Sequence, residues 1–325
     1  MRRTSRRNSA RKKHRRMSAA RKRRNRVLED FVRTRSASMR TLLETAEKVL
    51  DHDVNLLLLG ESGTGKDYLA EAIHACGKRR SKPFVKIDCA GIPAELFESE
   101  LFGFEKGTFT DAQSRKLGKL EAVQGGTVYF DDIASLAPAL QAKLLRAIQE
   151  KRFTRLGGNQ TLSLDGRVIS STSIPADELM AGLRRDLLYR INVVTLTIPP
   201  LRERREDIPR LARSFLARRK RGIDAEAMQM LVEHEWPGNI RELRNVIERA
   251  TLVEEGVTIT RAALPPITAD FVASASRNQW TLDVLESRYI REILRQTKSN
   301  YTRAATILGI NRKTLLEKRK RYGIE

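Results

Sequence analysis

The hydrophobic residues of this 325-residue chain follow two alternating patterns from about residue 38 onward. Stretches in which apolar residues recur every three or four positions predict helices, as at 39–50, 66–76 and 138–150. Short apolar runs of strand length lie between them, at 54–59, 84–87, 127–130, 168–172 and 193–198. Strands that alternate with helices predict a parallel sheet covered by helices on both faces, which is an α/β fold.

The strand pattern stops after Pro199 and Pro200. Residues 205–221, 224–235 and 239–253 then predict three helices, which form a small all-α domain. Prolines and serines between 264 and 280 predict a linker before a last helical segment. We therefore expect five parts: a basic disordered tail at 1–35, the α/β domain at 36–200, the all-α domain at 201–263, the linker at 264–280 and a helical domain at 281–325.

The net charge of +22 is concentrated at the two ends of the chain. Residues 1–35 hold 16 Lys and Arg against 2 Asp and Glu, and residues 277–325 hold 12 against 5. The part between them is nearly neutral, with 34 basic residues against 33 acidic ones. Basic ends on a neutral body indicate nucleic-acid contact outside the catalytic unit.

The remaining composition excludes several classes of protein. No apolar run reaches the roughly 18 residues that a membrane span needs. The two cysteines cannot form a disulfide framework, which is typical of a reducing compartment, and we expect a cytoplasmic protein. The four histidines have no metal-ligand spacing with either cysteine, which argues against a metalloenzyme of that kind.

A phosphate-binding loop follows the first predicted strand and precedes a predicted helix. Its sequence fits G-x-x-x-x-G-K, in which the glycines turn backbone N–H groups toward phosphate oxygens and Lys66 reaches the outer phosphates. Asp67 stands where this pattern has a Ser or Thr hydroxyl that binds Mg²⁺. We expect ATP and Mg²⁺ as cofactors. The expected nucleotide-binding residues are Gly60, Glu61, Ser62, Gly63, Thr64, Gly65, Lys66 and Asp67.

Two carboxylates end the predicted strand at 127–130, about 65 residues after the loop. Asp131 is expected to hold Mg²⁺ through water, and Asp132 to polarise the attacking water. Such a strand end is common in proteins, but its pairing with the phosphate loop makes a catalytic interpretation specific.

Six blocks in this order resemble the sigma-54-dependent transcriptional activators, also called bacterial enhancer-binding proteins, over residues 36–325. The blocks lie at 60–67, where the family also has an acid after the lysine, and at 100–103, 105–112, 155–158, 199–204 and 236–243. The resemblance implies an AAA+ P-loop domain, a small all-α lid domain and a C-terminal helix-turn-helix of the Fis type.

The resemblance also assigns roles to single residues. Arg184 and Arg190 fall where the family carries arginine fingers, which act on the neighbouring subunit's nucleotide and make a hexameric ring part of catalysis. Arg241 matches a lid arginine that senses nucleotide. The family's sigma-54 loop, in which Phe109 and Thr110 are expected to grip sigma-54, comprises Gly107, Thr108, Phe109, Thr110, Asp111 and Ala112.

Four positions depart from the family pattern. Asp132 replaces the usual Glu and is shorter by one methylene, which places its carboxylate further from the water. Asp88 replaces an Asn that holds that Glu in an inactive pose, so two acids are expected to meet there. Ser173, after Thr172, replaces a sensor Asn, and Asp111 replaces a glycine of the sigma-54 loop.

The C-terminal segment has the pattern of a DNA reader. An amphipathic helix at 281–294 precedes a helix at 301–310, a turn at Gly309 and a second helix that Asn311 can cap. The second helix would enter a major groove, and such readers bind as dimers to inverted repeats. The expected DNA-binding residues are Thr302, Arg303, Asn311, Arg312, Lys313, Thr314 and Lys318.

These features together predict an ATP-dependent, sequence-specific DNA-binding activator that remodels closed complexes of sigma-54 RNA polymerase. Because only a basic segment of about 35 residues precedes the ATPase, where a receiver or sensor domain is usual, we expect control by expression level or by a separate inhibitor protein. The alternative is an oligomeric, nucleotide-binding DNA regulator with impaired ATPase or remodelling activity. An AAA+ clamp or helicase loader is disfavoured because those proteins lack the loop at 107–112.

Overall fold

The computed structural model describes residues 34–109, 112–217, 219–265, 280–297 and 300–324. The chain divides into two compact units, Met1–Pro265 and Pro266–Glu325, and each is described by itself. Most of the expected tail and linker lies outside the described residues, as do Thr110 and Asp111 of the expected sigma-54 loop. No helix in the described part is long and apolar enough to cross a membrane.

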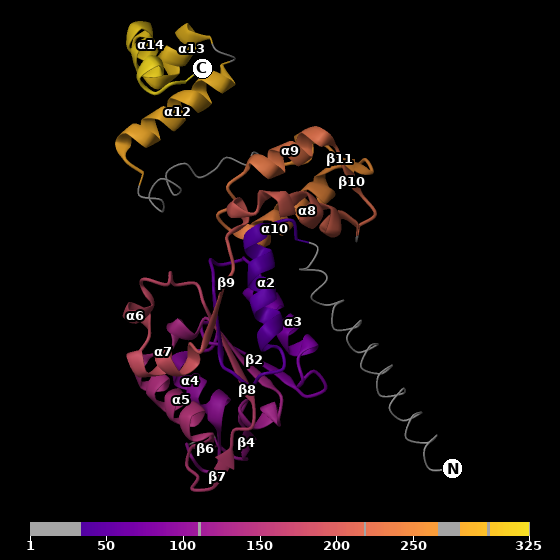
Figure 1. The fold of residues 1–325 in the computed structure, drawn as a ribbon, viewed down its shortest axis with the longest axis vertical. Helices are drawn as coiled ribbons and strands as arrows, with labels where there is room; N and C mark the ends of the chain where they lie inside the picture. Colours follow the sequence, from indigo (N-terminus) through magenta and orange to yellow (C-terminus); the bar gives the residue numbers. More distant parts are fainter. Residues whose placement is uncertain (1–33, 110–111, 218, 266–279, 298–299, 325) are drawn as a thin grey trace, which may run out of the picture. The chain divides into compact units, whose positions relative to one another are not determined.

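A five-stranded sheet forms the centre of the first unit (Figure 1). Its order is β2-β5-β8-β1-β9, and all its strand pairs are parallel. The strands are β1 (Leu56–Leu59), β2 (Phe84–Asp88), β5 (Thr127–Asp131), β8 (Arg167–Thr172) and β9 (Val194–Thr197). This arrangement confirms the predicted α/β fold, with each strand at its predicted place.

Two apolar cores cover the two faces of this sheet. Leu57 and Leu59 of β1 belong to one core, whereas Leu56 and Leu58 belong to the other, as the alternation of side chains along a strand requires. The first core includes α4 (Ala94–Phe102), α5 (Pro138–Glu150) and α7 (Arg185–Ile191). The second includes α2 (Ala37–Val49) and α3 (Lys66–Cys76).

Short elements that the sequence pattern had not indicated decorate the α/β part. They include two antiparallel pairs: β3 (Gly103–Phe104) with β4 (Lys116–Leu117), and β6 (Arg152–Thr154) with β7 (Thr161–Ser163). Two 3₁₀ turns, η1 (Glu121–Val123) and η2 (Ile133–Ser135), and a short helix α6 (Leu179–Gly182) complete it.

The lid contains the three predicted helices, α8 (Ile208–Ala217), α9 (Ala225–Glu233) and α10 (Asn239–Val253), with the 3₁₀ turns η3 (Leu201–Glu203), η4 (Arg205–Asp207) and η5 (Arg261–Ala263). It also has a two-residue parallel pair, β10 (Gly222–Ile223) with β11 (Thr258–Ile259), which the all-α prediction missed. Fully buried Trp236 fills its centre and donates from its indole N–H to the carbonyl oxygen of Leu231, 2.7 Å away.

The residues that lead into α2 are bound to the lid. The Thr34 hydroxyl donates to the carboxylate of Asp207 at 2.5 Å, and the Arg35 N–H donates to its other oxygen at 2.8 Å. Asp207 is buried, so these hydrogen bonds replace the water that an ionised carboxylate loses on burial. The segment before α2 and the lid therefore move together unless both bonds break.

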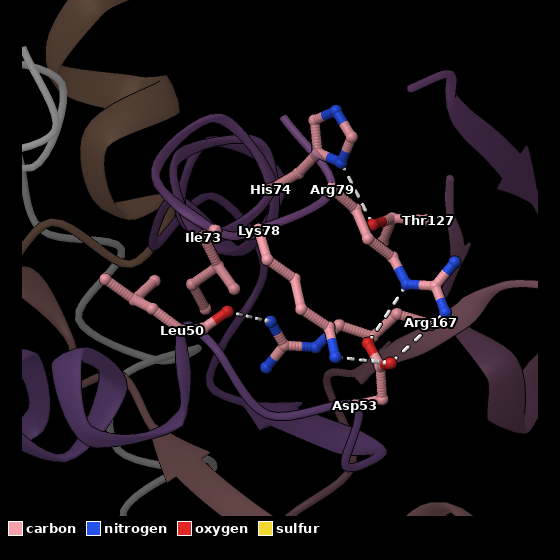
Figure 2. Close-up of a pocket in the computed structure, with 9 residues that line it drawn as sticks. Leu50, Asp53, Ile73, His74, Lys78, Arg79, Thr127 and Arg167 are labelled. Carbon is pink, nitrogen blue, oxygen red and sulfur yellow. Dashed lines mark hydrogen bonds and ion pairs between the residues drawn. The ribbon is translucent and has the colours of Figure 1, made fainter. Parts of the chain in front are cut away.

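A polar cluster with buried Arg167 at its centre lies at the amino end of the strands (Figure 2). Arg167, at the start of β8, donates to the carbonyl oxygens of Val49 and Leu50 at 2.8 and 3.1 Å, where α2 ends. Arg79 binds Asp53 nearby, 3.0 Å from Nε to Oδ1, and His74 Nδ1 lies 2.9 Å from the hydroxyl of Thr127. A buried cation at a helix carboxyl end satisfies free carbonyl groups, so Arg167 ties α2 to the sheet.

Within its described residues, 280–297 and 300–324, the second unit has three helices: α12 (Leu282–Gln296), α13 (Tyr301–Leu308) and α14 (Arg312–Arg321). Asn300 and Asn311 cap the last two helices by accepting from the backbone N–H of Arg303 and Thr314. Gly309 has φ +67° between them, a conformation that glycine adopts at little cost. The predicted helix-turn-helix is confirmed. Its core comprises Ile290, Ile293, Leu294, Ala304, Ala305, Leu315 and Ile324.

Candidate nucleotide site and DNA-binding helices

The phosphate loop connects β1 to α3 at the carboxyl end of the sheet. Gly60, Gly63 and Gly65 have φ of +151°, +78° and +102°, which side chains rarely tolerate. Lys66 donates from its Nζ to the carbonyl oxygens of Gly60 and Glu61 at 2.6 and 3.1 Å. Burial lowers the pKa of Lys66. The loop therefore has the backbone geometry of an anion cradle, with its ammonium group held inside it.

The two carboxylates next to the loop share partners. Tyr129, buried in β5, points its hydroxyl at Oδ1 of Asp67, Oδ1 of Asp131 and Oγ of Ser171, at 2.8, 3.1 and 2.9 Å. Lys86 of β2 forms an ion pair with each carboxylate. Burial opposes the ionisation of Asp131, but hydrogen bonds from Lys86 and Ser171 outweigh it and lower its pKa. The lowered pKa favours the ionised form of Asp131, and both acids present carboxylate oxygens next to the loop.

Asp132 follows in a left-handed conformation, with φ +54° and ψ +56°. Its backbone N–H donates to Ser171 Oγ at 3.1 Å, and its carboxylate accepts from Ser135 Oγ at 2.9 Å and from the N–H of Ser173 at 3.4 Å. A non-glycine residue with this conformation stores strain of the kind found at functional sites.

No hydrogen bond joins the described side chains of Asp88 and Asp132, which were expected to meet. The Asp88 carboxylate instead accepts from the N–H groups of Ala90 and Gly91, at 3.2 and 2.9 Å, and so closes the turn after β2. Thr172 is buried at the end of β8, with its hydroxyl accepting from the N–H of Ile174 at 3.1 Å. Only Ser173, of the expected switch residues, reaches toward Asp132.

The lid closes over the phosphate loop through side chains that the sequence analysis had not singled out. Arg202 binds the Glu61 carboxylate at 2.6 and 2.9 Å. Asn239 donates to Glu61 and to the carbonyl oxygen of Ser62, both at 3.0 Å, while its own amide oxygen accepts from Leu201 N–H at 2.7 Å. Asn239 is fully buried and has φ +53°, which marks it as a residue held in place by this network.

Two further lid arginines reach the loop. Arg204, buried, donates to the carbonyl oxygen of Thr64 at 2.8 Å. Arg241 donates to the hydroxyl of Ser62 at 2.8 Å. Arg241, the predicted nucleotide-sensing residue, therefore contacts the phosphate loop directly.

The predicted arginine fingers lie on the surface near α7. Arg184 precedes the helix, is exposed and pairs with Asp186 at 2.8 Å. Arg190, near its end, is also exposed and donates to the carbonyl oxygen of Ile148 at 3.5 Å. Neither of these partners belongs to the phosphate loop of the same chain.

The predicted sigma-54 loop projects from the β3–β4 pair. Gly107 has φ +82° and its N–H donates to the carbonyl oxygen of Ala112 at 2.8 Å, which closes the described ends of the loop. The Phe109 ring is 45% exposed and lies 4.7 Å from the ring of Phe104. Thr108 donates to the carbonyl oxygen of Leu156 at 3.0 Å.

Arg155 anchors the base of this loop. Its buried guanidinium pairs with Glu105 at 2.7 Å and with Glu121 at 2.6 Å. A bidentate arginine shared by two carboxylates fixes the geometry of the segment it holds. The loop therefore starts from a rigid base and carries an exposed aromatic side chain near its tip.

The predicted DNA-reading residues lie at the amino end of α14 and on α13. Thr302, Arg303, Arg312 and Lys313 are exposed, and Asn311 uses its amide oxygen to cap the helix, 2.8 Å from Thr314 N–H. Lys318 differs from the rest because its ammonium pairs with Glu286 of α12 at 2.8 Å. That pair contributes to the fold of this unit whether or not Lys318 also contacts phosphate.

Three known protein families match successive parts of the chain. Residues 32–197 match the sigma-54 interaction domain, residues 202–280 the AAA+ ATPase lid domain, and residues 281–322 the Fis family of bacterial regulatory proteins. The chain belongs to the sigma-54-dependent transcriptional activators. It is an activator with an AAA+ ATPase domain and a Fis-type DNA-binding helix-turn-helix.

Curated relatives share a large part of their length with this activator. The transcriptional regulatory protein ZraR of Klebsiella oxytoca is 46% identical over 299 residues, covering 88% of this chain and 68% of ZraR. The regulatory protein AtoC of Escherichia coli K12 is 42% identical, covering 90% and 68%. The activator thus spans about two thirds of these relatives.

Solved structures agree with the fold. NtrX from Brucella abortus in complex with ADP has a TM-score of 0.65 and 34% identity, covering 90% of this chain and 68% of NtrX. The NtrX complex with ATP has a TM-score of 0.66 at the same identity, covering 90% and 69%. The activator therefore shares its architecture with a nucleotide-bound protein of known structure.

Proposed function

We propose that this activator binds ATP with Mg²⁺, assembles into a ring and uses hydrolysis to remodel closed complexes of sigma-54 RNA polymerase. The main support for this proposal is the contact between the lid and the phosphate loop. Arg202, Asn239 and Arg241 of the lid all form hydrogen bonds with the loop. A nucleotide in the loop would change the charge that these residues face. Nucleotide state is thereby coupled to the position of the lid. The ADP and ATP complexes of the similar NtrX support this reading.

The residues at the carboxyl end of the sheet fit the chemistry of Mg²⁺. Asp131 and Asp67 present carboxylate oxygens, and Ser171 presents a hydroxyl 2.9 Å from Asp131. Hard oxygen donors of this kind are the ligands that Mg²⁺ prefers. The bound ion would neutralise charge on the phosphate oxygens. Asp131 and Asp67 would hold it, Lys66 would bind the phosphates, and Asp132 would orient the attacking water.

Arg184 and Arg190 would complete the site of a neighbouring subunit. Both are exposed, and their bonding partners are Asp186 and the carbonyl oxygen of Ile148. A guanidinium group supplied by a neighbour stabilises charge that develops on the transferred phosphoryl group. Hydrolysis would therefore require an oligomer, which we propose to be a hexameric ring.

The exposed loop at 107–112 would deliver the force to sigma-54. Its base is fixed by Arg155, and Phe109 is exposed near its tip. The Fis-type unit would place the ring upstream of the promoter by binding an inverted repeat as a dimer, with Arg312 and Lys313 nearest the bases. We place this activity in the bacterial cytoplasm, where sigma-54 polymerase works.

The test is open-complex formation by sigma-54 polymerase with the purified protein and ATP. Lys66→Ala serves as the control, because it removes the ammonium that binds phosphate while leaving the DNA-binding unit unchanged. The proposal expects open complexes with the natural chain and none with Lys66→Ala. A natural chain that hydrolyses ATP but opens no promoter at any concentration would refute remodelling.

A second candidate function is a nucleotide-binding DNA regulator with weak hydrolysis. The short Asp132 side chain favours it, because its carboxylate is already engaged by Ser135 and Ser173. This candidate expects DNA binding and nucleotide-dependent assembly with slow turnover and no open complexes. Open-complex formation that Lys66→Ala abolishes would exclude it.

A further inference from the structure

Lys86 contributes a positive charge to the candidate metal site. This lysine is not part of the phosphate-loop pattern. It lies on β2 next to Tyr129 of β5, with which it is in register. Its side chain is 38% exposed, and its ammonium lies 5.7 Å from the centre of the Tyr129 ring. The strand therefore carries this side chain across to the end of the neighbouring strand, where the carboxylates gather.

The ammonium of Lys86 joins the two carboxylates. It pairs with Oδ2 of Asp131 at 2.9 Å and with Oδ2 of Asp67 at hydrogen-bond distance. The Tyr129 hydroxyl lies within hydrogen-bond reach of the other oxygen of each acid. Asp67 and Asp131 are thus held side by side, 64 residues apart in the sequence, by one cation and one hydroxyl.

Lys66, the lysine of the phosphate loop, does not perform this task. Its ammonium donates to the loop carbonyl oxygens of Gly60 and Glu61. The negative charges of Asp67 and Asp131 are therefore compensated directly by Lys86 in the part of the chain that the structure describes. The oxygens that Lys86 occupies belong to the same acids that suit a divalent cation.

We propose that Lys86 is a positioning residue and a resident counter-ion, which competes with the divalent cation for Asp67 and Asp131. The inference rests on the metal role proposed for Asp131. In the absence of metal, Lys86 keeps two like charges together and prevents them from repelling each other. When a divalent cation binds, Lys86 gives up these carboxylate oxygens. The site accordingly requires more metal than the same carboxylates would without the lysine.

The experiment measures metal binding directly. Mn²⁺ alone is titrated into nucleotide-free protein, with free Mn²⁺ followed by electron paramagnetic resonance, for the natural chain, Lys86→Met, Lys86→Arg and Lys82→Met. Lys82 is an exposed lysine in the same segment and loses the same charge in its variant. We expect Lys86→Met to bind Mn²⁺ about three- to tenfold more tightly. Removing a partly exposed ion pair changes an affinity by roughly tenfold at most. Lys86→Arg and Lys82→Met should resemble the natural chain.

A second readout keeps the proposal testable if Mn²⁺ binds weakly. The Mg²⁺ concentration that gives half-maximal binding of a fluorescent ATP analogue should fall by the same factor in Lys86→Met. Mg²⁺ alone should also raise the thermal unfolding midpoint of Lys86→Met more than that of the natural chain. Equal metal affinities in the natural chain and Lys86→Met, or weaker binding by the variant, would overturn the inference.

Asp131→Asn separates the inference from the function on which it rests. If Asp131→Asn loses Mn²⁺ binding while Lys86→Met behaves like the natural chain, the metal role stands and the competition fails. If Asp131→Asn binds Mn²⁺ as well as the natural chain, the metal role of Asp131 fails, and the inference about Lys86 fails with it.

Discussion

Arg202 of the lid binds Glu61 of the phosphate loop through both ends of its guanidinium group, at 2.6 and 2.9 Å. A lysine cannot reproduce this two-point contact. We expect Arg202→Lys to weaken ATP binding about three- to tenfold, because the lid would hold the loop less firmly. The measurement is a titration with a fluorescent ATP analogue.

Arg205→Lys is the matched control for this change. Arg205 pairs with Glu235 at 2.6 Å within the lid, and its side chain is 42% exposed against 28% for Arg202. Its variant should bind nucleotide like the natural chain. Equal losses in both variants would show that the lid fold, and not the contact with Glu61, determines affinity.

Asp132→Glu should raise the rate of ATP hydrolysis. The added methylene moves the carboxylate toward the water that it is proposed to orient, and misplacement by about 1 Å can cost up to about 100-fold in rate. We expect the turnover number to rise at least several-fold, with the affinity for ATP unchanged, in steady-state kinetics. A lower turnover number in Asp132→Glu would mean that the surrounding Ser135 and Ser173 fit only the shorter acid.

Arg167→Met should destabilise the first unit. Arg167 is 4% exposed, and its removal leaves the carbonyl groups of Val49 and Leu50 without their charged donor. Hydrogen bonds to a charged group are worth about 1.5–3 kcal/mol, so we expect a loss of about 2–3 kcal/mol in urea unfolding. Arg146→Met, which alters an arginine whose side chain is 84% exposed, should change stability by less than about 0.5 kcal/mol.

His234 should make the lid sensitive to acid. Burial lowers the pKa of His234 to about 4, and its Nδ1 accepts from the N–H of Trp236 at 3.0 Å. Between about pH 6.5 and pH 4 the unfolded chain binds a proton that the folded lid does not, so stability falls as the pH falls through this window. Below the folded pKa both states bind the proton and this contribution becomes constant.

The measurement compares urea unfolding of the natural chain and of His234→Gln at pH 7.5 and at pH 5. His234→Gln does not titrate, so its stability relative to the natural chain should improve at the lower pH. A constant difference between the two proteins at both pH values would show that His234 does not drive the acid sensitivity.

Lys313 and Lys318 should behave differently toward DNA although both lie on α14. Lys313 is exposed near the amino end of the helix, so Lys313→Ala should weaken binding to the specific site by about 1–3 kcal/mol and leave unfolding unchanged. Lys318 pairs with Glu286, so Lys318→Met should lower the thermal stability of the unit. Mobility shifts and thermal unfolding of both variants test this, and equal behaviour would contradict it.

The helices at 66–76, 138–150 and 239–253 could be predicted because they are long enough to show a helical period, and the five strands because they coincide with short apolar runs. The pairs β3–β4 and β6–β7 could not, since two or three residues per strand carry no pattern. The Asn239–Glu61 contact joins residues 178 positions apart, so it depends on where the lid settles on the loop. The sequence predicts that Lys86 lies on a strand. It does not predict the ion pair with Asp67, because that contact depends on how β2 pairs with β5.

The bond from Thr34 to Asp207 offers a way to watch the lid. Any rotation of the lid must either pull residue 34 along or break this bond. Arg35 is exposed beside it and contributes only its backbone N–H to Asp207, so its side chain can be exchanged for a dye. A fluorescent dye at residue 35 would then report movements of the lid without altering the nucleotide site.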